Sequence, residues 1–269
     1  MIIISVRDSL DGDDKYGPDF SCFDLSFTGH STSDQNKRTF ASVKKLLKGK
    51  RVLLLIHGYN NDFSDVCRAY NKIETNLNET GHDYDEIVGF TWPGGDKGYD
   101  YFAAKRRSSV AAARLLDLMG RVDFGVLDVM SHSMGARIVY RALTDAPEDG
   151  SYLVRNHFST AAAIEDEHIE KGERYYSGTR LVEFNWIFHS RHDLVLKVWY
   201  QAGELDTPLG LHGPDDVRSI ERHSKNVKII NCKKYVKGHG DYKNSIEFHY
   251  FVSYVLYDQL PVSRQFFNL

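Results

Sequence analysis

The sequence has few of the features that mark a secreted or a membrane-spanning protein. Its 269 residues include only three cysteines, and Cys22, Cys67 and Cys232 are too few and too widely spaced for a disulfide framework or a four-thiolate zinc site. The longest aliphatic run, residues 52–56, is far shorter than the ~20 residues that cross a bilayer. The apolar start also turns charged at Arg7 and Asp8, too early for a signal peptide. We therefore expect a cytoplasmic protein with no membrane span.

The sequence also lacks an excess of charge of one sign. Its 34 lysines and arginines nearly balance 37 aspartates and glutamates, which leaves a formal net charge of −3. Such a chain has no strong field to attract a phosphate backbone or an anionic membrane. We therefore expect no nucleic-acid partner. With 42% hydrophobic residues, the composition is that of a globular protein with a sizeable core.

The chain alternates between two hydrophobic patterns. Short apolar runs that end near Gly, Asp or Asn indicate strands, and segments with apolar residues three and four apart indicate helices. This alternation predicts a mainly parallel twisted sheet with helices on both faces, an α/β three-layer sandwich joined by right-handed crossovers. Residues 1–269 are expected to form a single domain with its core at about 50–258. The pattern predicts strands at residues 1–6, 51–56, 86–92, 125–131, 158–164, 181–189 and 227–232, and helices at 40–47, 66–77, 103–119, with Val110 facing inward, 136–143 and 244–256.

The clearest local motif follows the strand that ends at Ser131. Ser133 stands between this strand and a helix, with the small residues Ser131 and Gly135 two positions away on either side. This is the arrangement of a nucleophile elbow, a sharp turn on which a serine hydroxyl projects from the sheet. The amino terminus of the next helix would place N–H groups beside developing negative charge. Ser133 is the predicted nucleophile, and a helix cap is the alternative interpretation.

With this elbow, the sequence resembles the α/β-hydrolase superfamily of serine hydrolases. The strings HGYNN at residues 57–61, TWP at 91–93 and SHSMG at 131–135 resemble one bacterial branch of it, over about residues 50–258. The resemblance implies that the backbone amides of Tyr59 and Met134 form the oxyanion hole. His57, which precedes Gly58, is expected to organise this loop and not to act as the catalytic base.

The resemblance also implies an acid and a base that follow the serine in the order Ser, acid, His. Asp193 lies in the loop where the superfamily places its acid, and His239 lies on a glycine-flanked loop before the last helix. His189 and His192 compete for the role of base, but both precede the acid. The competing carboxylates are Asp123 and Asp128 near the elbow strand, Asp215 and Asp216 in a surface turn, and Asp241, expected to cap the last helix.

Together these residues predict a serine hydrolase that cleaves a carboxylic ester, or a related small acyl substrate, through an acyl-enzyme. No metal and no organic cofactor are required. Trp92, Trp199 and Tyr200 are expected to line the substrate pocket, and no insertion long enough for a large lid is evident, which favours short or soluble substrates. Two alternatives remain. One is a non-catalytic interaction module, and the other is a metal-dependent hydrolase with ligands from His189, His192, Asp193, His239 and Asp241.

Overall fold

The computed structural model describes residues 1–9, 15–28, 31–95, 101–200, 204, 206–261 and 263–269; among these, the side chains of residues 26–28, 31–35 and 199 are not described. A ten-stranded sheet in the order β10-β9-β8-β7-β6-β4-β5-β1-β2-β3 runs through the molecule. The pairings from β10 to β1 are parallel, and β2 and β3 extend the sheet by antiparallel pairing. The predicted mainly parallel sheet is confirmed.

The elements alternate along most of the chain. The strands are β1 (Ile2–Arg7), β2 (Tyr16–Thr28), β3 (Ser31–Arg38), β4 (Arg51–Ile56), β5 (Glu86–Thr91), β6 (Val126–His132), β7 (Val154–Thr160), β8 (Val182–His189), β9 (Val227–Asn231) and β10 (Phe266–Asn268). The helices are α1 (Phe40–Leu47), α2 (Phe63–Thr80), α3 (Tyr101–Arg121), α4 (Met134–Thr144), α5 (Tyr176–Thr179), α7 (Leu209–His212), α8 (Val217–His223) and α9 (Ile246–Leu256). Short 3-10 turns form η1 (Asp166–Ile169) and η3 (Asp241–Lys243), and η2 (Leu196–Tyr200) is a π-helical turn.

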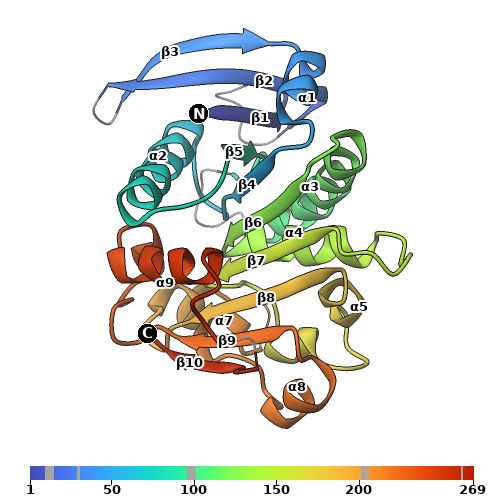
Figure 1. Ribbon diagram of the computed structural model, residues 1–269, viewed down its shortest axis with the longest axis vertical. Helices are drawn as coiled ribbons and strands as arrows, with labels where there is room; N and C mark the ends of the chain where they lie inside the picture. The colour runs from blue at the N-terminus through green and yellow to red at the C-terminus, as the bar shows by residue number, and fades with distance from the viewer. Residues whose placement is uncertain (10–14, 29–30, 96–100, 201–203, 205, 262) are drawn as a thin grey trace.

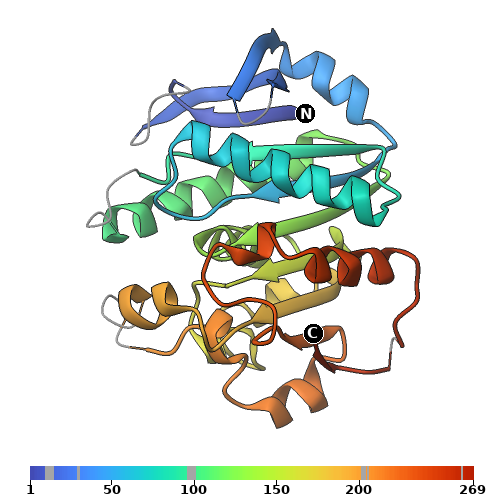
Figure 2. The ribbon, with the colours of Figure 1, turned by 90° about the vertical axis from the view of Figure 1, so that its left-hand side faces the viewer.

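Helices cover both faces of the sheet, so the fold has the three predicted layers. Helices α2 and α9 lie side by side on one face, and α3 and α4 pack on the other (Figures 1 and 2). Each face buries its own apolar cluster. Leu55 of β4 belongs to the cluster under α2 and α9, and its neighbour Leu54 belongs to the cluster under α3 and α4. This alternation explains why residues 51–56 are apolar throughout, as a strand covered on both faces must be.

The sequence pattern does not predict the antiparallel extension formed by β2 and β3. Near its start, after Tyr16, strand β2 contains Gly17, Pro18 and Asp19, residues typical of turns. Strand β3 is the polar sequence STSDQNKR at the sheet's edge. The expected inward position of Val110 is also wrong, because its side chain is 45% exposed. On α3, Ala111, Leu115 and Leu118 face the core instead. In the part of the chain described here, no helix is both long and apolar enough to span a membrane.

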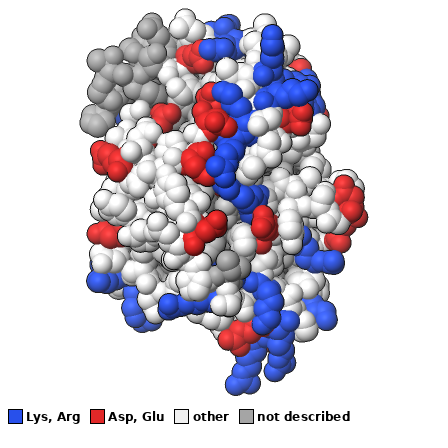
Figure 3. Space-filling model, viewed as in Figure 1, with Lys and Arg blue, Asp and Glu red and all other residues white. Residues whose placement is uncertain are grey.

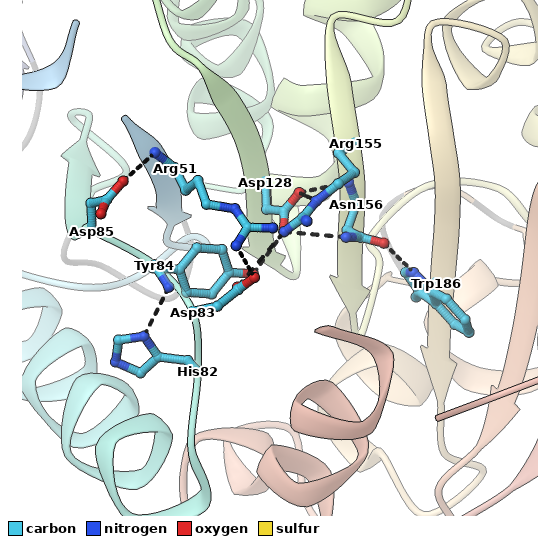
Figure 4. Close-up of polar contacts among 9 residues, drawn as sticks. All are labelled: Arg51, His82, Asp83, Tyr84, Asp85, Asp128, Arg155, Asn156 and Trp186. Atoms are coloured by element: carbon cyan, nitrogen blue, oxygen red, sulfur yellow. Dashed lines mark hydrogen bonds and ion pairs between the residues drawn. The ribbon is translucent and has the colours of Figure 1, made fainter. Parts of the chain in front are cut away.

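A buried polar network joins the amino-terminal ends of the central strands (Figure 4). The Asp128 carboxylate of β6 accepts two hydrogen bonds from the Arg155 guanidinium, at 2.7 and 3.0 Å, and one from the Tyr84 hydroxyl at 2.8 Å. Asn156 donates to the same carboxylate and accepts from the Trp186 indole. Asp128 therefore has a structural role, at the opposite end of the strands from Ser133.

Candidate active site

Ser133 occupies a strained turn between β6 and α4. Its φ of 56° and ψ of −121° fall in a region that L-residues rarely adopt. The turn is held from β7, because the Ser133 amide donates to the Thr160 carbonyl at 3.0 Å. Gly135 is required for close packing, since a Cβ there would lie 2.5 Å from the Ile56 carbonyl oxygen. The strand, turn and helix thus have the geometry of a nucleophile elbow.

The loop after β4 packs directly against this turn. A Cβ on Gly58 would lie 2.9 Å from the Cβ of Ser133, so only glycine fits there without a shift. The His57 ring is buried, and its Nδ1–H donates to the Gly58 carbonyl at 2.8 Å, while its Nε2 accepts from the Trp92 amide at 3.2 Å. Burial and the nearby Arg7 hold the pKa of His57 well below its usual value. These contacts give His57 the expected loop-organising position.

Asp193 and His239 form a direct pair. The Asp193 carboxylate is 1% exposed, and its Oδ2 accepts a hydrogen bond from His239 Nδ1 at 2.7 Å. An ionised carboxylate can only accept, so the bond places a proton on Nδ1 and leaves Nε2 as the basic nitrogen of the neutral ring. The second oxygen, Oδ1, accepts from the Leu196 amide at 3.0 Å and fixes the carboxylate's orientation. The two segments that carry this pair follow β8 and β9.

Two side chains hold the loop of His239: His132, which the sequence reasoning missed, and Asp241, to which it gave a different role. His132 Nε2–H donates to the His239 carbonyl at 2.8 Å, and the two rings lie 4.5 Å apart between centroids. Burial and the His239 ring lower the pKa of His132 to about 3, which keeps it neutral. Asp241 does not cap the last helix as expected. Its carboxylate accepts from the Lys237 and Gly238 amides, and Ser245 caps α9.

A cavity of about 410 Å³ lies between the Ser133 turn, the loop after β4 and the loop of His239. Its walls include Ser133, His239, Tyr59 and Met134. Met134 is the first residue of α4, so its amide is one of the N–H groups that a helix leaves without an intrahelical acceptor. The cavity therefore brings together the predicted nucleophile, the predicted base and both residues of the predicted oxyanion hole.

Of the three residues predicted to line the substrate pocket, one lines the cavity, one does not, and the side chain of the third is not described. Tyr200 lines the cavity. Trp92 does not line it, which corrects the expectation: the indole is fully buried behind the loop, stacks on the His57 ring and donates to the His57 carbonyl at 3.0 Å. The side chain of Trp199 lies outside the described part of the structure, although its backbone belongs to η2.

The competing histidines, His189 and His192, do not line the cavity. His192 is exposed, and the ring of His189 lies against Gly213, where burial lowers its pKa to about 4. Among the described residues, the group of potential ligands close enough to share a metal ion is Glu165, Glu167 and Asp206, none of which lines the cavity. Acidic clusters of this kind are common on protein surfaces.

Charge on the surface is mixed. On the face shown in Figure 3, basic side chains run through the upper and central part with acidic side chains beside them. Within the described lining of the cavity there is no carboxylate, and the histidines and Lys243 are the residues there that can carry charge.

The sheet, the elbow and the carboxylate-histidine pair after later strands define the class of α/β hydrolases. Comparison with protein families agrees. The chain belongs to the family described as alpha/beta hydrolase of unknown function (DUF900), whose model matches residues 32–242. No curated protein matches the sequence.

Similar solved structures share low identity with this chain. A 2,6-dihydroxy-pseudo-oxynicotine hydrolase is 9% identical with a TM-score of 0.44, and the match covers 91% of this chain and 66% of that one. The lin2722 gene product of Listeria innocua is 12% identical with a TM-score of 0.42, covering 82% and 98%. LpqC, a poly(3-hydroxybutyrate) depolymerase from Bordetella parapertussis, is 12% identical with a TM-score of 0.35, covering 82% and 74%.

Proposed function

We propose that this protein is a serine hydrolase that cleaves a carboxylic ester of a small molecule through an acyl-enzyme. The observation that carries the proposal is the 2.7 Å bond between Asp193 and His239 beside a cavity that Ser133 also lines. A serine alone is a weak nucleophile, and it needs a base that a third group orients. Esters are preferred to thioesters and amides here because they are the commoner substrates of this fold.

In the proposed first half-reaction, the Ser133 hydroxyl attacks the ester carbonyl as His239 Nε2 takes its proton. The Asp193 carboxylate keeps the other ring proton on Nδ1 and stabilises the imidazolium that forms. The amides of Tyr59 and Met134 donate to the tetrahedral oxyanion. Each such donor contributes roughly two to three orders of magnitude to the rate in enzymes where one has been removed. The imidazolium then protonates the leaving alcohol, and the acyl-enzyme remains.

Deacylation repeats these steps with water. His239 removes a proton from a water molecule, whose oxygen attacks the acyl carbon, and the second tetrahedral oxyanion occupies the same amides. Collapse of this intermediate returns the proton to Ser133 Oγ and releases the carboxylic acid. The neutrality of His132 supports this cycle, because a second cation beside His239 would oppose formation of the imidazolium.

A fluorophosphonate probe tests the nucleophile. The probe should label the wild-type protein and not Ser133→Ala, and Ser151→Ala, an exposed serine, is the matched control that should label normally. Equal labelling of Ser133→Ala and wild type would refute the assignment. The same probe would not label a non-catalytic module.

Hydrolysis of 4-nitrophenyl acetate tests the base. Activity should disappear in His239→Ala and remain in His192→Ala, because His192 is exposed and lies outside the cavity lining. Activity should also survive EDTA. Loss of activity with EDTA and recovery on adding a divalent metal would instead favour a metal-dependent hydrolase.

A further inference from the structure

The part of the cavity that extends beneath α2 and α9 has apolar walls. We call this part the inner arm and define it by Leu55, Val66, Ala69, Ile73, Met130 and Phe248. Leu55 and Met130 are paired on the neighbouring strands β4 and β6, so they form adjacent parts of its floor. Val66, Ala69 and Ile73 come from α2, and Phe248 comes from α9, the two helices that lie side by side in Figures 1 and 2.

The spacing of the α2 residues gives the inner arm its direction. Positions 66, 69 and 73 share one face of the helix, three and four residues apart. At 1.5 Å per residue, they span about 10 Å along the helix. Met130 lies three residues before Ser133 on the same strand and turn, so the arm extends from the nucleophile back along the sheet. One helical turn beyond Ile73, the Asn76 side chain donates to the Lys243 carbonyl at 2.8 Å and joins α2 to η3.

Tyr70 and Tyr242 lie beside the inner arm, and their hydroxyl groups are already hydrogen-bonded to the protein backbone. The Tyr70 hydroxyl donates to the Phe90 carbonyl at 2.6 Å and accepts from the His57 amide at 2.9 Å. The Tyr242 hydroxyl donates to the Phe188 carbonyl at 3.2 Å. A tyrosine has one donor proton, and in both residues a backbone carbonyl already takes it. A polar group placed here would lose its hydration without gaining these donors.

We infer that the inner arm binds the aliphatic chain of an acyl group whose carbonyl is attacked by Ser133, so that the substrates are esters of medium-chain fatty acids. This inference rests on the proposed function and adds the class of acyl group to it. It also changes the preference for short substrates that the lack of a large lid suggested. Each methylene buried in such an arm should raise kcat/KM about fourfold until the arm is filled.

The first experiment compares 4-nitrophenyl esters from acetyl to dodecanoyl. For the wild type, kcat/KM should rise with chain length to a maximum at a medium chain. Ala69→Phe places a ring in the arm and should lower the ratio of octanoyl to acetyl kcat/KM at least tenfold. Ala113→Phe, the same change at an exposed position of α3, is the matched control and should leave the ratio unchanged. A flat chain-length profile, or an unchanged ratio in Ala69→Phe, would overturn the inference.

A variant that enlarges the arm covers the case in which Ala69→Phe does not fold. Ile73→Ala removes a side chain from the wall, and the best acyl chain should become longer. A profile identical to that of the wild type would count against the arm.

Binding measured without turnover separates this inference from the proposed function. Decanoic acid should bind Ser133→Ala in calorimetry, and adding Ala69→Phe should weaken binding at least tenfold, whereas adding Ala113→Phe should not. Binding of this kind without fluorophosphonate labelling of the wild type would support the arm and reject the serine mechanism. Labelling of the wild type without decanoate binding would support the serine mechanism and reject the inner arm as an acyl-chain site.

Discussion

The substitution Asp193→Asn gives the sharpest test of the proposed mechanism, because the structure determines which way the new amide must face. Asp193 Oδ1 accepts from the Leu196 amide at 3.0 Å, and Oδ2 accepts from His239 Nδ1 at 2.7 Å. An asparagine keeps its oxygen toward the Leu196 N–H, since turning it would set two donors against each other. Its NH₂ group then donates to His239 Nδ1, and the ring proton moves to Nε2, where it blocks proton transfer from Ser133.

The expected loss follows from this change of tautomer. A carboxylate-to-amide change in a serine-protease triad lowers kcat about 10⁴-fold, and we expect a fall of about 10³- to 10⁴-fold here. This fall corresponds to about 4 to 5.5 kcal/mol of transition-state stabilisation. The assay is kcat for 4-nitrophenyl acetate, with circular dichroism to verify folding. Asp215→Asn, at an exposed position, is the control. A folded Asp193→Asn enzyme that keeps more than a tenth of wild-type kcat would refute the assigned role.

Three further predictions concern stability. Gly135→Ala should lower the free energy of unfolding in urea by about 1–3 kcal/mol, because its Cβ would lie 2.5 Å from the Ile56 carbonyl oxygen; wild-type stability would contradict the close packing. Asp128→Asn should cost about 3 kcal/mol, at the low end for a broken buried pair because the Arg155 side chain is 23% exposed, and a midpoint unchanged in urea would argue against this network. Burial lowers the pKa of His157 to about 3 and that of His249 to about 4. Above pH 6.5 these rings are neutral in both states, but as pH falls from 6.5 toward 4 the unfolded chain takes up protons first. The free energy of unfolding should therefore be lower at pH 5 than at pH 7.5, and equal values would show that these rings are not buried as neutral groups.

The parts of the site that could be predicted from the sequence are those with local signals. Ser133 could be predicted because the strand, the turn and the helix that define its role are adjacent in the chain. The family resemblance supplied the order Ser, acid, His, which pointed to Asp193 and His239. His132 was missed because its role depends on a carbonyl 107 residues away. Trp92 was assigned to the pocket from its place at a strand end, but its stacking on His57 depends on how β4 and β5 pair.

The fold shows the same division between local and long-range information. The apolar run at residues 51–56 predicts a central strand, because a strand that is buried on both faces needs apolar residues at successive positions. Strand β3 gives no such signal. It lies at the edge of the sheet, and an edge strand does not need apolar residues along its length. Its pairing with β2 is instead supplied by backbone hydrogen bonds, which do not depend on side-chain type. Val110 was misplaced because a helix dense in alanine offers several possible inward faces.

Under the proposed mechanism, the backbone conformation of Ser133 links hydrolase activity to a loss of thermal stability. A residue held at φ 56° and ψ −121° without glycine's freedom destabilises the folded state by about 1–3 kcal/mol. Glycine at position 133 would remove most of that penalty together with the hydroxyl. Directed evolution of this protein for thermal stability alone should therefore enrich a variant that is more stable but lacks hydrolase activity. A selection for stability must select for substrate hydrolysis at the same time.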